Sequence, residues 1–422
     1  MSARPGPDLT AAGYAESEWA VAGTASSYAA DDLPTDGRWT LSRSGEADFV
    51  TRAMLRRPAD SAAFSGTLVA EWLNVSSGAD AAPDWTYLAD EIVRRGHAWV
   101  GISAQHVGVE GGSSAVGDLG LGALKAIERY AALCHPGDAF AYGIFAEVVA
   151  ALDTTGPASD LDVECRLAIG ESQSAYALTS YANGVHPITA IFDGFLIHSR
   201  GGAAMPVGDP GRAVDIASFR AGPPTRIRDD LDVPVILVQT ETDLLGHLDY
   251  LPARQPDGER LRLWEVAGAA HADKFQIGEF EDFLGCPDLV NRGQQAYVVR
   301  AALRHLDSWA RGGDPAPAAA RLGVDGGTFV LDDVGNATGG VRTPVVDAPV
   351  EVLSGLADPG ASAICRLFGT TRPLAGDDLA RLYPGGDAEH RAAYERATDA
   401  AIAAGFVLAE DRTEILNERR TP

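Results

Sequence analysis

The fold expected for this 422-residue chain is decided by the stretch Arg166-Leu167-Ala168-Ile169-Gly170-Glu171-Ser172-Gln173-Ser174-Ala175-Tyr176-Ala177. Leu167–Ile169 is an apolar run of strand length, Gly170 allows a tight turn, and the residues from Gln173 onward suit a helix. This order is typical of a nucleophile elbow, in which a strained turn projects a serine hydroxyl above a sheet. We therefore predict that Ser172 is a nucleophile and that the amide of Gln173 faces the developing oxyanion.

The motif departs from the usual G-x-S-x-G pattern because Ser174 stands where the second glycine is expected. Serine is still small, and the position must be small because the helix and the strand approach closely there. A match this loose is expected roughly once by chance in a chain so rich in Gly, Ala and Ser. Gly111–Ala115 also matches, but it follows no convincing apolar strand, so we interpret it as a loop. The assignment of Ser172 therefore depends on the rest of the chain.

The composition limits the class of protein and its partners. A hydrophobic content of 46% with 22% charged residues is ordinary for a soluble globular protein with a large core. The formal net charge of −25 leaves no basic excess to neutralise phosphates, so we expect no nucleic-acid partner. Residues 1–18 lack a basic start followed by an apolar run, and no apolar segment is long enough to span a membrane. We expect a cytoplasmic protein with no membrane contact.

The cysteine pattern and the motif content predict no metal and no cofactor. The four cysteines are widely spaced and form no C-x-x-C pair, so a disulfide framework or a zinc site is not expected, although one long-range disulfide remains open. They are Cys134, Cys165, Cys286 and Cys365. No H-E-x-x-H sequence is present, and no G-x-G-x-x-G is followed by a helix and a matching acid.

Strand-like and helix-like segments alternate through the first three quarters of the chain, which predicts a mostly parallel sheet covered by helices on both faces. Strands are expected at Trp19–Ala22, Trp39–Leu41, Asp48–Pro58, Gly66–Trp72, Ala98–Ile102, Leu167–Ile169, Ile188–Phe192, Pro234–Val238 and Leu261–Val266. Helices are expected at Pro83–Arg95, Ala123–Leu133, Ala139–Leu152, Gln173–Tyr181 and Gln294–Ala310.

We divide the chain into a core, residues 1–312, and a C-terminal appendage, residues 313–422, that packs on the core. The core carries an insertion at about 199–230, rich in Gly, Pro and Arg, which we expect to act as a cap. Together with the Gly-rich loop at 105–122, the insertion is expected to form the rim or lid of the site. In the appendage we expect β-like runs at Gly327–Leu331, Val350–Leu353 and Ile364–Phe368 and a helix near Glu389–Ala404.

A serine elbow needs a base and an orienting acid, which in this kind of sheet follow the serine in the order acid, then histidine. The strand ending at Val238 runs into Thr240-Glu241-Thr242-Asp243, and the strand ending at Val266 runs into a loop that contains His271. We therefore predict His271 as the base. Asp243 is the preferred acid, because it lies where this fold usually carries the acid, and Glu241 is the alternative.

The second oxyanion donor should come from the loop after the strand that ends at Trp72. The backbone amide of Asn74 is our first candidate, with Leu73 and Val75 close behind. His106, His198 and His247 fall on loops that could rim the pocket, whereas Trp72 and Trp85 are interpreted as core residues. The remaining histidines are assigned to surfaces or turns.

Several of these segments together resemble the bacterial "alpha/beta hydrolase domain" family of the α/β-hydrolase superfamily. The segments are Thr51–Pro58, Glu71–Val75, Gly170–Ser174, Thr240–Asp243, Arg262–Gly268, His271–Asp273 and Cys365–Gly369. The resemblance implies an α/β-hydrolase fold, a serine nucleophile at Ser172 and a base at His271. Since it extends from about residue 40 to about residue 420, it also implies that the appendage is an integral part of the domain.

Taken together, the sequence predicts a serine hydrolase that cleaves a small-molecule carboxylic ester through an acyl-enzyme on Ser172. The same three side chains would also serve for lactone, thioester or amide cleavage, or for acyl transfer to an alcohol. A non-catalytic binding protein that keeps the fold is the alternative from a different class. The sequence leaves the substrate and the oligomeric state open.

Overall fold

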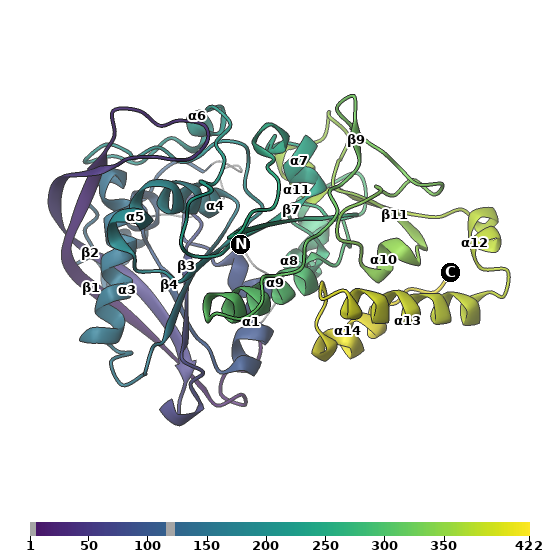
Figure 1. Cartoon of the computed structure of the whole chain (residues 1–422), viewed down its shortest axis with the longest axis horizontal. Coiled ribbons are helices and arrows are strands. Elements are labelled where there is room, and N and C mark those ends of the chain that lie inside the picture. The colour runs from purple at the N-terminus through teal and green to yellow at the C-terminus, as the bar shows by residue number, and fades with distance from the viewer. Residues whose placement is uncertain (1–5, 115–122) are drawn as a thin grey trace.

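The computed structural model describes residues 6–114 and 123–422, and its centre is an eight-stranded sheet (Figure 1). The strands follow the order β1-β2-β4-β3-β5-β6-β7-β8 across the sheet. The pairs β1–β2 and β2–β4 are antiparallel, and every other pair is parallel. Their bounds are β1 (Tyr14–Ala29), β2 (Ser42–Pro58), β3 (Thr67–Trp72), β4 (Ala98–Ile102), β5 (Cys165–Glu171), β6 (Gly194–His198), β7 (Val235–Thr240) and β8 (Leu261–Val266).

Helices cover both faces of the sheet, which explains why its central strands are apolar almost throughout. Buried residues of α1 and α9 form one hydrophobic cluster with one face, and buried residues of α3 and α4 form a second cluster with the other face. The helices of the first 310 residues are α1 (Pro83–Arg95), α2 (His106–Glu110), α3 (Ala141–Thr154), α4 (Gln173–Ser180), α5 (His186–Thr189), α6 (Ile216–Arg220), α7 (Glu241–Leu245), α8 (Lys274–Ile277) and α9 (Gln295–Ala310).

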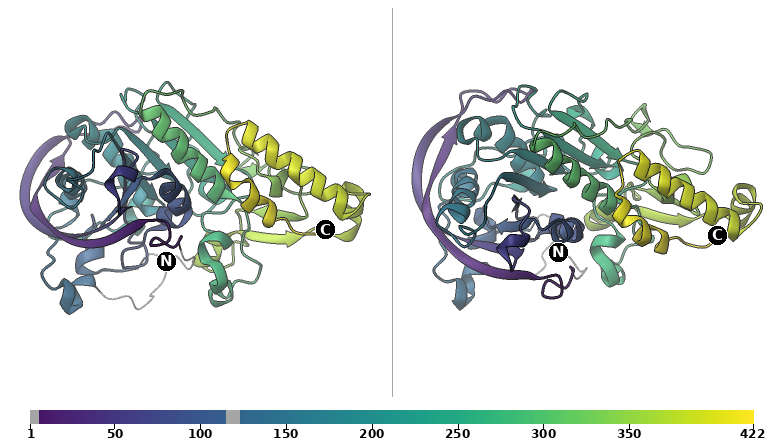
Figure 2. Two further views of the ribbon diagram at one scale, coloured as in Figure 1. Left: turned by 90° about the horizontal axis from the view of Figure 1, so that it is seen from below. Right: turned by 60° about the horizontal axis from the view of Figure 1, so that its bottom comes forward.

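The two N-terminal strands are much longer than the sequence suggested. β1 and β2 pair along nearly their whole length, from Tyr14 opposite Pro58 to Ala29 opposite Ser42, and curve around one end of the molecule (Figure 2). The expected strand at Trp19–Ala22 is only a part of β1. The strand expected at Trp39–Leu41 does not form, and β2 begins just after it, at Ser42.

Three other expected elements are wrong, and all of them are short or weakly amphipathic segments. In place of a strand at Ile188–Phe192, a helical turn ends at Thr189 and strand β6 begins at Gly194. In place of the strand at Ile364–Phe368, helix α11 (Ala363–Phe368) forms, with the Ser362 side chain accepting a hydrogen bond from the Cys365 amide. A short apolar run is compatible with either structure, and packing decides between them.

The helix expected at Ala123–Leu133 is replaced by two single 3₁₀ turns, Leu124–Ala126 and Glu128–Tyr130. Apart from Leu133 at its end, its apolar residues are not buried, and Ile127 is 54% exposed. A short helix depends on burying one apolar face, so this segment gains nothing from a regular helix. Residues 115–122, which include part of the Gly-rich loop and the end of the second G-x-S-x-small match, lie outside the described residues.

Residues 313–422 lie beside the core and contact it at several points (Figure 1). Val341 forms a parallel bridge with Val266 at the end of β8, and the buried guanidinium of Arg300 on α9 pairs with Asp411 and Glu414. The elements of this segment are β9 (Val324–Asp325), β10 (Thr328–Phe329), α10 (Pro344–Asp347), β11 (Glu351–Ser354), α11, β12 (Thr370–Pro373), α12 (Gly376–Leu382), α13 (Asp387–Ala403) and α14 (Arg412–Asn417).

A disulfide between Cys286 and Cys365 also joins the two parts of the chain, across 79 residues of sequence. This is the single long-range disulfide that the cysteine spacing left open, whereas Cys134 and Cys165 are free thiols. Cys286 follows the 3₁₀ segment Gly278–Leu284, and Cys365 lies on α11, so the bond fixes these two segments to each other.

Removing this bond should destabilise the protein because it relaxes a long loop in the unfolded chain. We expect the double variant Cys286→Ser/Cys365→Ser to lose about 2–4 kcal/mol of unfolding free energy, measured by urea denaturation. Cys134→Ser, which changes an exposed free thiol, is the matched control and should unfold as the wild type does. Coincident unfolding curves for the double variant and the wild type would contradict the structural role of the bond.

Candidate active site

Ser172 lies on a sharp turn between β5 and α4, with backbone angles φ 62° and ψ −120°. A non-glycine residue rarely adopts this conformation, and such strain is typical of functional turns. The amide of Ser172 donates to the carbonyl oxygen of His198 on the neighbouring strand, at 2.9 Å. A Cβ atom at Gly170 would lie 3.0 Å from Cβ of Ser174, which explains why both positions carry small residues.

The side chain of Ser172 is hydrogen-bonded to His271, which lies in the loop after β8. The Ser172 Oγ atom is 2.9 Å from Nε2 of His271, and the Nδ1 atom of the same ring is 2.8 Å from Oδ1 of Asp243. Asp243 lies in the first turn of α7, where its Oδ2 atom accepts hydrogen bonds from the amide and the hydroxyl of Thr240. The structure therefore brings together three residues that are distant in the sequence, since Asp243 follows Ser172 by 71 positions and His271 follows Asp243 by 28.

Glu241, the alternative acid, points away from the imidazole. Its two carboxylate oxygens accept hydrogen bonds from the amides of Gly268, at 2.6 Å, and Gly355, at 2.8 Å. Gly355 belongs to the C-terminal segment, so this carboxylate joins that segment to the loops after β7 and β8. The neighbouring Thr242 hydroxyl accepts from the amide of His271 and donates to the carbonyl oxygen of Gly355.

The electrostatic surroundings favour the protonated imidazole of His271. Burial alone would lower its pKa, but the hydrogen bond and charge of Asp243, followed by the charge of Glu171, raise the pKa above its usual value. A positive charge on His198 would oppose this effect. A histidine held in this way can accept a proton from the serine and remain stabilised as the imidazolium ion.

Glu171 is a buried neighbour of this group that the sequence analysis missed. Its Oε1 atom lies 3.6 Å from Nε2 of His271, and burial raises the pKa of its carboxyl to about 7 despite the opposing charges of His271 and His198. In the sequence it occupies the variable position before the serine, where nothing distinguishes it from a solvent-exposed carboxylate.

All three amides that are candidates for the second oxyanion donor already donate a hydrogen bond within the protein, two of them to backbone carbonyls. Leu73 donates to the carbonyl of Ile102 at 3.2 Å, and Asn74 donates to the carbonyl of Ala81 at 2.8 Å. The amide of Val75 donates at 3.3 Å to the side-chain oxygen of Gln173, the residue after the serine. A long bond to a side chain is replaced by a ligand more easily than a bond to backbone, so Val75 is better suited than Asn74 to the role.

Two cavities open at Ser172 and differ in chemistry. The larger, of about 300 Å³, is lined by His271 and by apolar residues of α8, the 3₁₀ segment and α11, among them Ile277, Leu284 and Leu367. The smaller, of about 50 Å³, combines the polar groups of Arg220, His247 and Tyr176 with apolar residues, among them Ile216 and Leu248.

Some, but not all, of the residues that the sequence placed at the rim of the site line these two cavities. Ile216 and Arg220 lie in the insertion at 199–230, so this segment contributes to the smaller cavity, as does His247. His198 is instead fully buried behind the elbow, where its Nδ1 atom lies 2.9 Å from Asp84. His106 lines neither cavity and packs edge-on against His135. The contribution of α11, in the C-terminal segment, was not expected.

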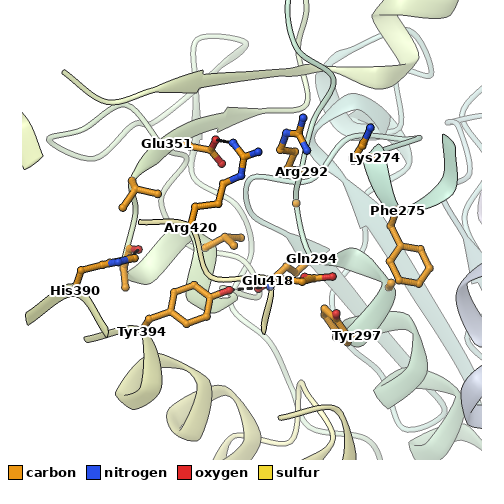
Figure 3. A pocket seen from close by; sticks show the side chains of 15 residues that line it. Lys274, Phe275, Arg292, Gln294, Tyr297, Glu351, His390, Tyr394, Glu418 and Arg420 are labelled. Atoms are coloured by element: carbon orange, nitrogen blue, oxygen red, sulfur yellow. Dashed lines mark hydrogen bonds and ion pairs between the residues drawn. The ribbon is translucent and has the colours of Figure 1, made fainter. Parts of the chain in front are cut away.

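A further cavity, of about 230 Å³, lies between the core and the C-terminal segment and contains no member of this group (Figure 3). Some of its charged and polar side chains bond to one another, whereas Lys274 and Arg292 pair with Glu281 outside the cavity. Arg420 lies 2.5 Å from Glu351, and the amide of Gln294 donates to Tyr394 and to Glu418. We attribute this cavity to the packing of the two parts of the chain.

The described residues contain neither a candidate metal centre nor a candidate membrane span. Within residues 6–114 and 123–422, no group of three or more His, Cys, Asp or Glu side chains is placed to hold a metal ion. In the same residues, no helix is both long enough and apolar enough to cross a membrane.

Comparison with known proteins gives a family and a set of distant structures. The model of the family described as "Alpha/beta hydrolase domain" matches residues 1–417, while no curated protein matches the chain. Among solved structures, esterase Est22 is 12% identical and aligns over 72% of this chain and 82% of its own, with a TM-score of 0.36. A cold-adapted esterase from an Arctic intertidal metagenomic library is 12% identical and aligns over 60% of this chain and 84% of its own, with a TM-score of 0.34. A fungal esterase from Rhizomucor miehei is 10% identical and aligns over 69% of this chain and 84% of its own, with a TM-score of 0.38.

The position of Glu171 predicts how its removal changes the titration of His271. In Glu171→Gln, a negative charge that raises the histidine pKa is lost, so the pKa of His271 should fall relative to the wild type. NMR titration of the imidazole Cε1 proton measures this directly. Glu279→Gln, an exposed carboxylate elsewhere, is the control and should leave the pKa unchanged. An unchanged or higher pKa in Glu171→Gln would show that Glu171 does not act on the imidazole.

Proposed function

Because this chain belongs to the alpha/beta hydrolase domain family, whose fold it shares, we propose that it is a serine hydrolase that cleaves carboxylic esters of small molecules. The observation that carries the proposal is the continuous chain of hydrogen bonds from Ser172 through His271 to Asp243. A serine hydroxyl is a weak nucleophile at neutral pH, and this arrangement is the one that activates it. The strained turn at Ser172, next to two cavities, supports the same reading.

In the proposed first step, the Ser172 oxygen attacks the ester carbonyl carbon while Nε2 of His271 takes the serine proton. The carbonyl oxygen becomes an oxyanion, and we assign its stabilisation to the amides of Gln173 and Val75. Gln173 is the first residue of α4, where an amide has no acceptor within its own helix. Asp243 holds the imidazole in the required tautomer and stabilises its positive charge.

The tetrahedral intermediate then breaks its bond to the alcohol oxygen, which receives the proton from His271. The acyl group remains on Ser172 as an ester. In the second half, His271 takes a proton from water, the resulting hydroxide attacks the acyl carbonyl, and the serine oxygen leaves with that proton. The products are the carboxylic acid and the free serine. Amide or thioester cleavage would follow the same steps with a different leaving group.

Hydrolysis of p-nitrophenyl esters from acetate to palmitate tests the proposal. We expect the wild type to be active and Ser172→Ala to lose at least about a thousandfold in kcat, because the nucleophile is removed. Ser174→Ala, two residues further on the same turn, is the control and should keep most of the activity, since its hydroxyl has no hydrogen-bond partner among the described residues. A folded wild type that cleaves no ester of the series would favour a binding protein instead.

The two acids of the loop after β7 should behave differently. Asp243→Asn should lower kcat by roughly ten-thousandfold, because an amide favours the wrong tautomer of the imidazole. Glu241→Gln should keep kcat within about tenfold and lower the unfolding free energy, since Glu241 joins loops rather than orienting His271. Kinetics on one ester and urea denaturation measure both effects. A larger loss of kcat in Glu241→Gln than in Asp243→Asn would reverse the assignment.

A further inference from the structure

The smaller cavity at Ser172 contains an arginine that has no acidic partner in the described part of the chain. Arg220 ends α6, is half-buried, and donates from Nη2 to the carbonyl oxygen of His247 at 3.0 Å. No carboxylate of the described residues forms an ion pair with it, although the chain carries a net charge of −25. A half-buried guanidinium without a counter-charge is costly unless a ligand supplies one.

The groups around Arg220 strengthen this positive character. Arg366 on α11 acts on the same histidine, His247, and it also has no ion pair within residues 6–114 and 123–422. Burial, followed by the charges of Arg220 and Arg366, lowers the pKa of His247 to about 4, so this ring is neutral at pH 7. The Tyr176 side chain is 1% exposed and lines the same cavity, and burial raises its pKa to about 12, so its hydroxyl remains a donor.

The position of His271 decides which part of an ester occupies this cavity. The imidazole must deliver a proton to the leaving alcohol oxygen, so the alcohol must lie on the same side as His271. His271 lines the larger, apolar cavity and does not line the smaller one. The alcohol group therefore extends into the apolar cavity, between α8, the 3₁₀ segment and α11, and the acyl group enters the small cavity that contains Arg220.

The size of the small cavity limits the acyl group. A volume of about 50 Å³ accommodates only a few non-hydrogen atoms beyond the carbonyl. A short chain that ends in an anion would satisfy both the size and the charge of this site. A carboxylate is the anion that the planar guanidinium binds best at this scale, through two parallel hydrogen bonds.

We propose that the substrate is a half-ester of a short dicarboxylic acid with an apolar alcohol, and that Arg220 binds its free carboxylate. This inference rests on the proposed ester hydrolysis and names the class of substrate for the same site. Arg366 contributes to the positive potential of the cavity, and Tyr176 is a second donor for the carboxylate. The acyl group transferred to Ser172 would then be a short acid with a negative end, released as the diacid.

The test compares two esters that differ only in charge, monohexyl succinate and its uncharged isostere hexyl succinamate, together with hexyl butyrate. Release of hexanol by the wild type, Ser172→Ala, Arg220→Gln, Arg220→Lys and Arg212→Gln is measured by chromatography. We expect the wild type to prefer the succinate over the succinamate by at least tenfold in kcat/KM. Arg220→Gln should lose about 10–100-fold on the succinate and much less on the two neutral esters, so that the preference disappears.

Arg220→Lys should retain part of the preference, because it keeps the charge and loses the paired hydrogen bonds. Arg212 is an exposed arginine of the same insertion, 3.8 Å from Asp209, and Arg212→Gln should behave as the wild type does. Thermal unfolding establishes that each variant is folded.

Activity on hexyl butyrate distinguishes a failure of the proposed substrate from a failure of the proposed ester hydrolysis. If butyrate is cleaved in a Ser172-dependent way but the succinate is not preferred, or if Arg220→Gln keeps the preference, the substrate inference is overturned while the proposed function stands. If a folded wild type cleaves none of the three esters, the proposed function and the inference that rests on it both fall.

Discussion

The imidazole of His271 is held at both of its nitrogens, by Asp243 on one side and Ser172 on the other, and much of the fold keeps it there. β7 and β8 are adjacent parallel strands, so the loops that follow them meet at one edge of the sheet. Asp243 is anchored by Thr240 at the start of α7, and the His271 amide is anchored by Thr242. The elbow then brings the serine to the same edge.

The C-terminal segment takes part in this arrangement. Through Gly355 it bonds to Glu241 and Thr242, the two residues that precede Asp243, and through α11 it forms one wall of the larger cavity. The disulfide fixes that wall to the segment that carries Leu284. The C-terminal segment is therefore part of the candidate site. The cytoplasmic location expected from the sequence stays a prediction, and structural disulfides such as Cys286–Cys365 are typical of oxidising compartments.

The sequence predicted the elements that strong local signals define. The strand, glycine and serine around Ser172 and the acid-rich and histidine-bearing loops after β7 and β8 follow from motif and order alone, because parallel strands bring their carboxyl ends together. The sequence alone does not distinguish Asp243 from Glu241, since both lie in the first turn of α7 and the direction of each side chain depends on how that turn is oriented. The roles proposed for Glu171 and Arg220 could not be predicted from the sequence, because burial, and the lack of a counter-charge among the described residues, arise only from tertiary packing. The strands expected at Ile188–Phe192 and Ile364–Phe368 were wrong because short apolar runs do not distinguish strand from helix.

In the function proposed for this protein, the chain of hydrogen bonds makes Ser172 a nucleophile in the folded state. Covalent labelling by a fluorophosphonate probe, followed by peptide mass mapping, tests it most directly. We expect a single adduct on Ser172 in the native protein and no adduct in urea, where His271 and Asp243 no longer act on the serine. An adduct on another residue, or a folded protein that takes up no label, would contradict it.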